Sequence, residues 1–127
     1  MLAKEVTKEN LNTLVIKFYT KVLKDDLVGP IFIDILGKNL KEDKWPAHIE
    51  LLTNFWASLA LGEKKYNSSP FAPHIEFKER LSVAAFERWL QLFSQTLDTI
   101  FHPQIAEQFL AKSKTIAANF MRNLQIT

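Results

Sequence analysis

The sequence predicts an all-α protein made of a single domain. Four segments carry apolar residues at helical spacing, with polar residues on their opposite sides. No segment rich in β-branched residues alternates apolar and polar positions with the period of two that a strand shows. The length of 127 residues fits one domain spanning residues 1–127, and the 47% of hydrophobic residues can fill one sizeable core.

The first expected helix begins after Thr7, whose side-chain oxygen is suited to accept a hydrogen bond from a free backbone N–H. Its apolar residues recur at i, i+3, i+4 and i+7 through residues 11–23. Tyr19 lies on this apolar side, so its hydroxyl points inward and needs a partner there. Gly29–Pro30 then ends the helix and begins a short apolar connecting stretch that includes Phe32, which we expect to pack over the core.

The second expected helix places a histidine on an apolar face. That face consists of Trp45, His48, Leu52, Phe55, Trp56 and Leu59. His48 is interpreted either as a core histidine bonded to a neighbour or as a polar group in an apolar pocket. The long connection over residues 63–77 holds His74 close to Pro70 and Pro73, which stiffen the backbone. A metal ligand needs a fixed imidazole direction, although His74 alone also fits an ordinary loop histidine.

The third and fourth expected helices complete the core. Ser82 can cap the third, whose inner residues are Phe86, Trp89, Leu90, Phe93, Leu97 and Ile100. Trp89 brings an indole N–H to this buried side, where it needs an acceptor. His102–Pro103 breaks the chain, and no role is assigned to His102. The fourth helix is expected from about Gln104 to Gln125 and places Ile116 and Phe120 on its apolar side.

Tyr19, His48 and Trp89 thus bring three hydrogen-bond donors inward from three separate helices. Leaving a donor buried without a partner costs on the order of 1–3 kcal/mol. A small polar ligand held between the helices would satisfy all three. The ten Phe residues indicate either a very aromatic core or a pocket for a flat apolar ligand.

Composition excludes several classes of function. The net charge of +2, with no basic run, gives no reason to expect a nucleic-acid partner. No stretch reaches the roughly 20 apolar residues of a membrane span, and the first residues lack the apolar core of a signal peptide. The absence of cysteine excludes disulfides, cysteine-ligated zinc and thiol catalysis. No nucleophile–histidine–acid set indicates a hydrolase. We therefore expect a cytoplasmic domain and a monomer.

The order and spacing of several short motifs resemble those of the truncated haemoglobins, most closely their third, bacterial group. These motifs are Phe18-Tyr19, the Gly-Pro-Ile-Phe run ending at Phe32, His48, Asn54-Phe55-Trp56-Ala57, His74, and Trp89 within Phe86-Glu87-Arg88-Trp89-Leu90. The resemblance covers essentially the whole chain. The 26 residues from His48 to His74 suit a distal and a proximal histidine on opposite faces of a haem. The Gly-Gly pairs usual in the first two groups are absent.

The resemblance implies a globin-like, two-over-two helical sandwich around haem b. His74 would be the proximal ligand of the iron. Tyr19 and Trp89 would donate hydrogen bonds to bound dioxygen, and His48 would stand at the distal entrance and gate access. Phe32 would pack on the porphyrin, and the remaining pocket wall would consist of Leu52, Phe55, Phe93, Ile116 and Phe120. Lys78 and Arg80 are candidate partners of the haem propionates.

The function expected from this resemblance is reversible binding of dioxygen, and of nitric oxide or carbon monoxide, with slow release. One alternative is a haem redox enzyme acting as a nitric oxide dioxygenase or in a peroxidase-like reaction. That activity would require an unidentified electron donor, because the sequence has no flavin or nicotinamide motif. A second alternative is a haem-free helical interaction module, in which Tyr19, His48 and Trp89 are ordinary core residues.

Overall fold

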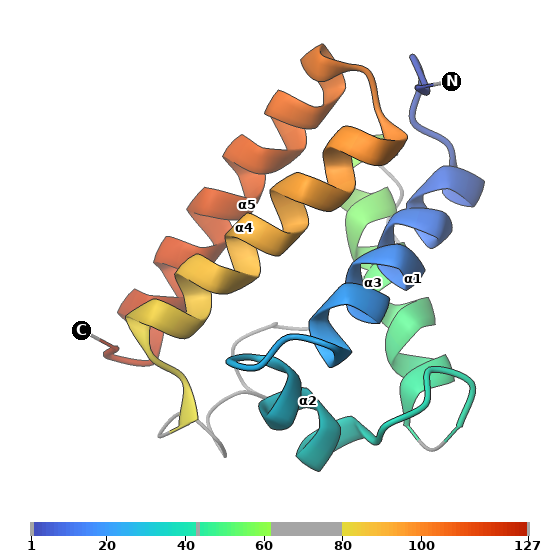
Figure 1. Ribbon diagram of the computed structural model, residues 1–127. Helices are drawn as coiled ribbons and strands as arrows, with labels where there is room; N and C mark the ends of the chain where they lie inside the picture. Colours follow the sequence, from blue (N-terminus) through green and yellow to red (C-terminus); the bar gives the residue numbers. More distant parts are fainter. Residues whose placement is uncertain (1, 43, 62–79, 127) are drawn as a thin grey trace.

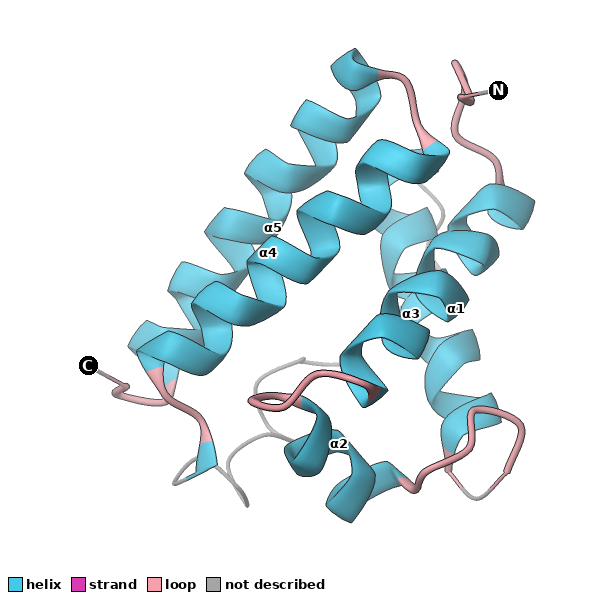
Figure 2. Cartoon of the chain, viewed as in Figure 1, coloured by secondary structure: helices cyan, strands magenta, loops and turns pink. Residues whose placement is uncertain are grey.

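The structure, a computed structural model, describes residues 2–42, 44–61 and 80–126, which form helices joined by loops (Figure 1). Five α-helices lie within these described residues: α1 (Lys8–Leu23), α2 (Gly29–Leu36), α3 (Trp45–Leu61), α4 (Val83–Ile100) and α5 (Pro103–Asn123). Figure 2 shows no strand in the described residues. Their β-structure is limited to one isolated bridge between Ala3 and Phe101. The all-α prediction and its four long helices are therefore confirmed.

Two of the helix starts are fixed by the residues that the sequence indicated. Thr7 caps α1 by accepting a hydrogen bond from the Asn10 backbone N–H, while the Asn10 side chain accepts one from the Thr7 backbone N–H. The Ser82 hydroxyl accepts a hydrogen bond from the Ala85 backbone N–H and caps α4 in the same manner. These caps satisfy backbone donors that have no partner within the helix.

The apolar stretch after Gly29–Pro30 is a helix, α2, and our prediction of a connecting stretch was wrong on this point. Pro30 lies in its first turn, where the missing N–H costs little. The turn before α2 is held by Asp25, whose Oδ2 accepts hydrogen bonds from the backbone N–H groups of Leu27 and Val28, both at 3.0 Å. α2 is only eight residues long, and residues 31–36 are apolar except for Asp34, so the sequence does not distinguish this short apolar run from a connecting stretch.

The helices form two packed layers. α1 packs on α3 in one layer, and α4 packs on α5 in the other. α1 also contacts α4, and this contact joins the two layers. Among these helix pairs, the only one that includes α2 is its pair with α1. Figure 1 shows α4 and α5 running antiparallel side by side, with α2 closing one end of the molecule near the start of α4. This is the two-over-two sandwich that the resemblance implied.

The periphery shows two further features. Leu59, predicted on the inner face of α3, is exposed, and its carbonyl accepts a hydrogen bond from the exposed Lys112 side chain, so this end of α3 lies at a solvent-facing edge. Ala3 is pinned to the corner between α4 and α5 by backbone hydrogen bonds with Ile100 and His102, both at 2.8 Å. Among the described helices, none combines the length and the hydropathy that crossing a membrane requires.

Candidate functional site

A cavity lies between the two layers and is bordered by all five helices. Its volume is about 220 Å³, against the roughly 10–15 Å³ that holds one water molecule. It is lined by Val15, Phe18, Tyr19, Val28, Ile31, Phe32, His48, Leu51, Leu52, Phe55, Trp56, Leu81, Ala85, Phe86, Trp89, Phe93, Ile116, Ala117 and Phe120. Among the described lining residues, only Tyr19, His48 and the two tryptophans carry side-chain oxygen or nitrogen atoms, so this part of the cavity suits a ligand that is largely apolar.

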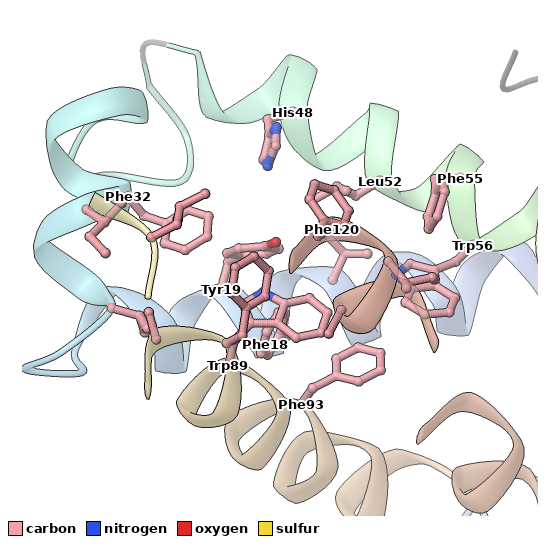
Figure 3. A pocket seen from close by; sticks show the side chains of 18 of the residues that line it. Phe18, Tyr19, Phe32, His48, Leu52, Phe55, Trp56, Trp89, Phe93 and Phe120 are labelled. Atoms are coloured by element: carbon pink, nitrogen blue, oxygen red, sulfur yellow. The ribbon is translucent and has the colours of Figure 1, made fainter. Parts of the chain in front are cut away.

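The cavity brings together nearly all the predicted site residues that the structure describes. Tyr19 comes from α1, Phe32 from α2, His48 from α3 and Trp89 from α4. Figure 3 shows His48 pointing from α3 into the cavity, across from Tyr19 and Trp89. The five predicted wall residues also line it: Leu52, Phe55, Phe93, Ile116 and Phe120.

Tyr19 and Trp89 form a hydrogen-bonded pair. The Tyr19 side chain is buried, and burial raises the pKa of its phenol, an effect that the hydrogen bond with Trp89 offsets in part. An indole N–H can only donate, so Trp89 donates to the Tyr19 oxygen. Tyr19 therefore stays protonated at physiological pH, and its own O–H proton can point into the cavity. Trp89 thus supplies the partner that the inward Tyr19 was expected to need.

Ring packing holds this pair in place. Phe18 meets Tyr19 edge-on at a centroid separation of 4.7 Å and Trp89 at 5.1 Å. Trp89 in turn stacks on Phe93 at 5.2 Å with only 15° between the ring planes. Such offset and edge-to-face pairs are favourable beyond the area they bury. The donor pair is consequently preorganised by a cluster from α1 and α4.

His48 is half-buried and packs in a T-shaped manner on two aromatic rings. Its ring centroid lies 5.8 Å from that of Tyr19 and 5.5 Å from that of Trp45. It takes part in a further interaction besides these. The apolar-pocket interpretation of His48 agrees with its place in the cavity lining.

Of the predicted cations and the predicted metal ligand, the structure describes Arg80 alone, and Arg80 is not part of this cavity lining. Arg80 forms an ion pair with Asp34 of α2 through Nη1 and Oδ2 at 2.9 Å, and both side chains are exposed to solvent. It therefore lies at the surface between α2 and the start of α4. His74 and Lys78 fall outside the described residues.

Sequence reasoning assigned no site role to several lining residues. Trp56 and Phe86 were placed on inner helix faces but were not separated there from the rest of the core. Ala85 and Ala117 are buried, and their small side chains leave room in the cavity. Small residues on otherwise bulky inner faces of α4 and α5 were the signal available in the sequence.

Comparison of the sequence with known proteins identifies the family of this chain. No model of a protein family matches the sequence. A curated relative, "Group 3 truncated hemoglobin ctb" from Campylobacter jejuni subsp. jejuni serotype O:2 (strain ATCC 700819 / NCTC 11168), is 32% identical over 119 residues, which cover 94% of this chain and 91% of the relative. The chain belongs to the group 3 truncated haemoglobins.

The fold of this truncated haemoglobin agrees with that assignment. The crystal structure of group III truncated hemoglobin from Campylobacter jejuni superimposes with a TM-score of 0.84 at 31% sequence identity. The match covers 98% of this chain and 95% of that one. The family suggested by the motifs from Phe18-Tyr19 to Trp89 is thereby confirmed.

Proposed function

We propose that this truncated haemoglobin is a haem protein that binds dioxygen and other diatomic ligands, with haem b in the cavity between its helical layers. The observation that carries the proposal is the apolar cavity with the buried Tyr19 and the half-buried Trp89 as a donor pair in its wall. Membership of a haemoglobin family agrees with it. A haem-free interaction module is not favoured, because such a module would gain nothing from a hollow core.

The residues present fit a haem. Haem is flat and apolar over most of its area, and the cavity offers aromatic and aliphatic side chains on several sides. Phe32 contributes a half-buried ring from α2, and Phe120 another ring from α5. In this proposal Phe32, Leu52, Phe55, Phe93, Ile116 and Phe120 are the contacts of the porphyrin.

His74 is proposed as the protein ligand of the iron. A proximal histidine is the usual axial ligand in globins. Support comes from the sequence, where the neighbouring prolines stiffen the segment, and from family membership. Bound haem supplies an iron atom to which a diatomic ligand can attach.

The Tyr19 hydroxyl is proposed as the donor to the diatomic ligand, with Trp89 supporting it. Dioxygen becomes partly negative when it binds to ferrous iron, whereas carbon monoxide stays nearly apolar. A neutral O–H donor in a dry cavity therefore stabilises dioxygen more than carbon monoxide. The Trp89 N–H polarises the Tyr19 hydroxyl by donating to the Tyr19 oxygen. The Trp89 N–H can also turn toward the diatomic ligand. Two such donors suit tight holding and slow release.

His48 and the cations have proposed roles at the edges of the site. Leu51 beside His48 is 44% exposed, so this side of the cavity is close to solvent. His48 would gate entry there. Arg80 would have to exchange its exposed Asp34 partner for a haem propionate, a small change because exposed ion pairs are worth about 0–1 kcal/mol. Lys78 stays a candidate for the same role.

Haem reconstitution tests the proposal. Purified protein with added haem should develop a strong Soret band, and the reduced form should give distinct spectra under dioxygen and under carbon monoxide. His74→Ala should retain haem much less well, whereas His102→Ala, a matched change at an exposed histidine outside the cavity lining, should retain it as the wild type does. Failure of the wild-type protein to take up haem would refute the function.

The same preparation distinguishes binding from turnover. With dioxygen, nitric oxide and an added reductant, a binding protein should produce no more than about one nitrate per haem. Continued nitrate production would instead indicate the dioxygenase activity, with an electron donor still to be found.

A further inference from the structure

Trp45, the first residue of α3, is completely buried but is not part of the cavity lining. It packs behind that lining, against three of its members. Its ring centroid lies 5.2 Å from that of Tyr19 and 5.5 Å from that of His48. It also stacks on Phe32 at 6.3 Å, with 25° between the planes. The Trp45 indole thus packs against cavity-lining residues from α1, α2 and α3.

The indole is held in a single orientation by a hydrogen bond. Its Nε1–H donates to the backbone oxygen of Gly37 at 2.7 Å. Gly37 ends α2 with φ of 104°, in the left-handed region that favours glycine. Its own N–H donates to the carbonyl of Ile33 at 2.9 Å, so the acceptor is itself anchored on α2. Trp45 therefore connects the end of α2 to the start of α3.

This connection adds a fixed contact to two rings of the cavity lining. Tyr19 is held on one side by Phe18, and Trp45 packs on another part of the ring. His48 lies one turn after Trp45 on the same face of α3 and packs edge-on against it. A rotation of the Trp45 indole would open space beside both Tyr19 and His48.

We propose that Trp45 is a positioning residue that fixes Tyr19 and His48 at the ligand side of the cavity through its hydrogen bond to Gly37. It touches neither the haem nor the ligand in this proposal, which rests on the proposed haem function. Trp45 thereby acts on ligand release through the orientation of the Tyr19 hydroxyl.

The test compares Trp45→Phe with the wild-type holoprotein. The variant keeps an aromatic face but loses the N–H donor and part of the ring. The dioxygen dissociation rate should rise by about tenfold, the lower end of what loss of an outer-shell partner costs at metal sites. The ¹H–¹⁵N indole signal of Trp89, measured in the diamagnetic carbon monoxide form, should also shift, because Trp89 donates to Tyr19.

A matched control separates positioning from general loss of stability. Phe101→Leu changes a completely buried ring at the corner between α4 and α5, and Phe101 lies outside the cavity lining. It should lower the melting temperature but leave the dioxygen rate and the Trp89 signal unchanged. Equal changes in both variants would overturn the proposal, as would wild-type values in Trp45→Phe.

Two further arms keep the proposal falsifiable. If Trp45→Phe does not fold, 3-benzothienylalanine at position 45 keeps the bicyclic ring with sulfur in place of the N–H, and a wild-type dioxygen rate there would refute the role of the hydrogen bond. If the wild-type protein takes up no haem, the proposed function fails. The Trp89 signal of the haem-free protein then tests the positioning alone, and only a shift in Trp45→Phe supports it.

Discussion

Replacing Tyr19 with phenylalanine removes one oxygen atom from the cavity and little else. The ring packs against Phe18 at 4.7 Å, Trp45 at 5.2 Å and Phe32 at 5.3 Å, and phenylalanine can keep all three contacts. Tyr19 is only 5% exposed, so water does not readily replace its hydroxyl. The change therefore isolates one hydrogen bond from the packing around it.

The size of the effect follows from the chemistry of that bond. A hydrogen bond to a charged or strongly polarised group contributes about 1.5–3 kcal/mol. Because about 1.4 kcal/mol corresponds to a tenfold change in an equilibrium or rate constant, dioxygen should dissociate about ten- to hundredfold faster from Tyr19→Phe. Trp89 loses its acceptor in this variant and can turn its N–H toward the ligand, which favours the lower end of the range.

Stopped-flow displacement of dioxygen by carbon monoxide measures the rate. Carbon monoxide dissociation from the same variant is the internal control and should change much less, because that ligand carries little charge. Haem content and the Soret spectrum should match the wild type. If the two dioxygen rates agree within about twofold while haem is retained, Tyr19 is not the donor and the proposed ligand chemistry is wrong.

Three predictions concern the turn that supports α2. Asp25 Oδ1 accepts a hydrogen bond from Arg88 Nε at 2.7 Å and its side chain is only 7% exposed, so Asp25→Asn should lower the free energy of unfolding by about 1.5–3 kcal/mol in urea titrations. Asp34→Asn, which breaks the exposed pair with Arg80, is the control and should cost less than about 1 kcal/mol. Burial of Asp25 acts to raise its pKa, but hydrogen bonds from the Val28 N–H, Arg88 and the Leu27 N–H outweigh it and lower the pKa. The stability that the Asp25 carboxylate contributes is thus present above its unfolded pKa of about 3.9 and is lost as pH falls through the lower folded value. The free energy of unfolding of Asp25→Asn should therefore depend less on acid pH than that of the wild type. Equal acid profiles of the two proteins would contradict this. Gly29→Ala should cost about 1–3 kcal/mol in the same titrations, because an added Cβ would lie 2.9 Å from a backbone oxygen at the end of α1, and an unchanged midpoint would refute the close approach.

The long helices were predictable because their physical signals are local. Thr7 and Ser82 mark helix starts through their own hydroxyls, and the apolar stripes of α1 and α4 reveal which faces are buried. α2 was missed because its stability comes from tertiary contacts and from the capping of the preceding turn by Asp25, neither of which leaves a periodic pattern.

The cavity was predictable only in part. Inward donors could be read from helix faces, so Tyr19, His48 and Trp89 were found as a set. The hydrogen bond between Tyr19 and Trp89 depends on how α1 crosses α4, and the sequence of either helix alone does not contain that angle. The same holds for Trp45, which looked like any other residue on the inner face of α3.

Burial acts to raise the pKa of both Asp25 and Tyr19, but the hydrogen bonds around the two groups lead to opposite net shifts. Asp25 has several donors around its carboxylate, so it is kept as an anion in the turn between α1 and α2. Tyr19 has one indole donor, which does not outweigh burial, so it is kept as a neutral O–H. A fixed anion at Tyr19 would repel a ligand that gains negative charge on binding, whereas a neutral hydroxyl stabilises it. The fold therefore places its buried charge where it holds helices together and keeps the cavity wall uncharged at Tyr19, where the diatomic ligand is proposed to bind.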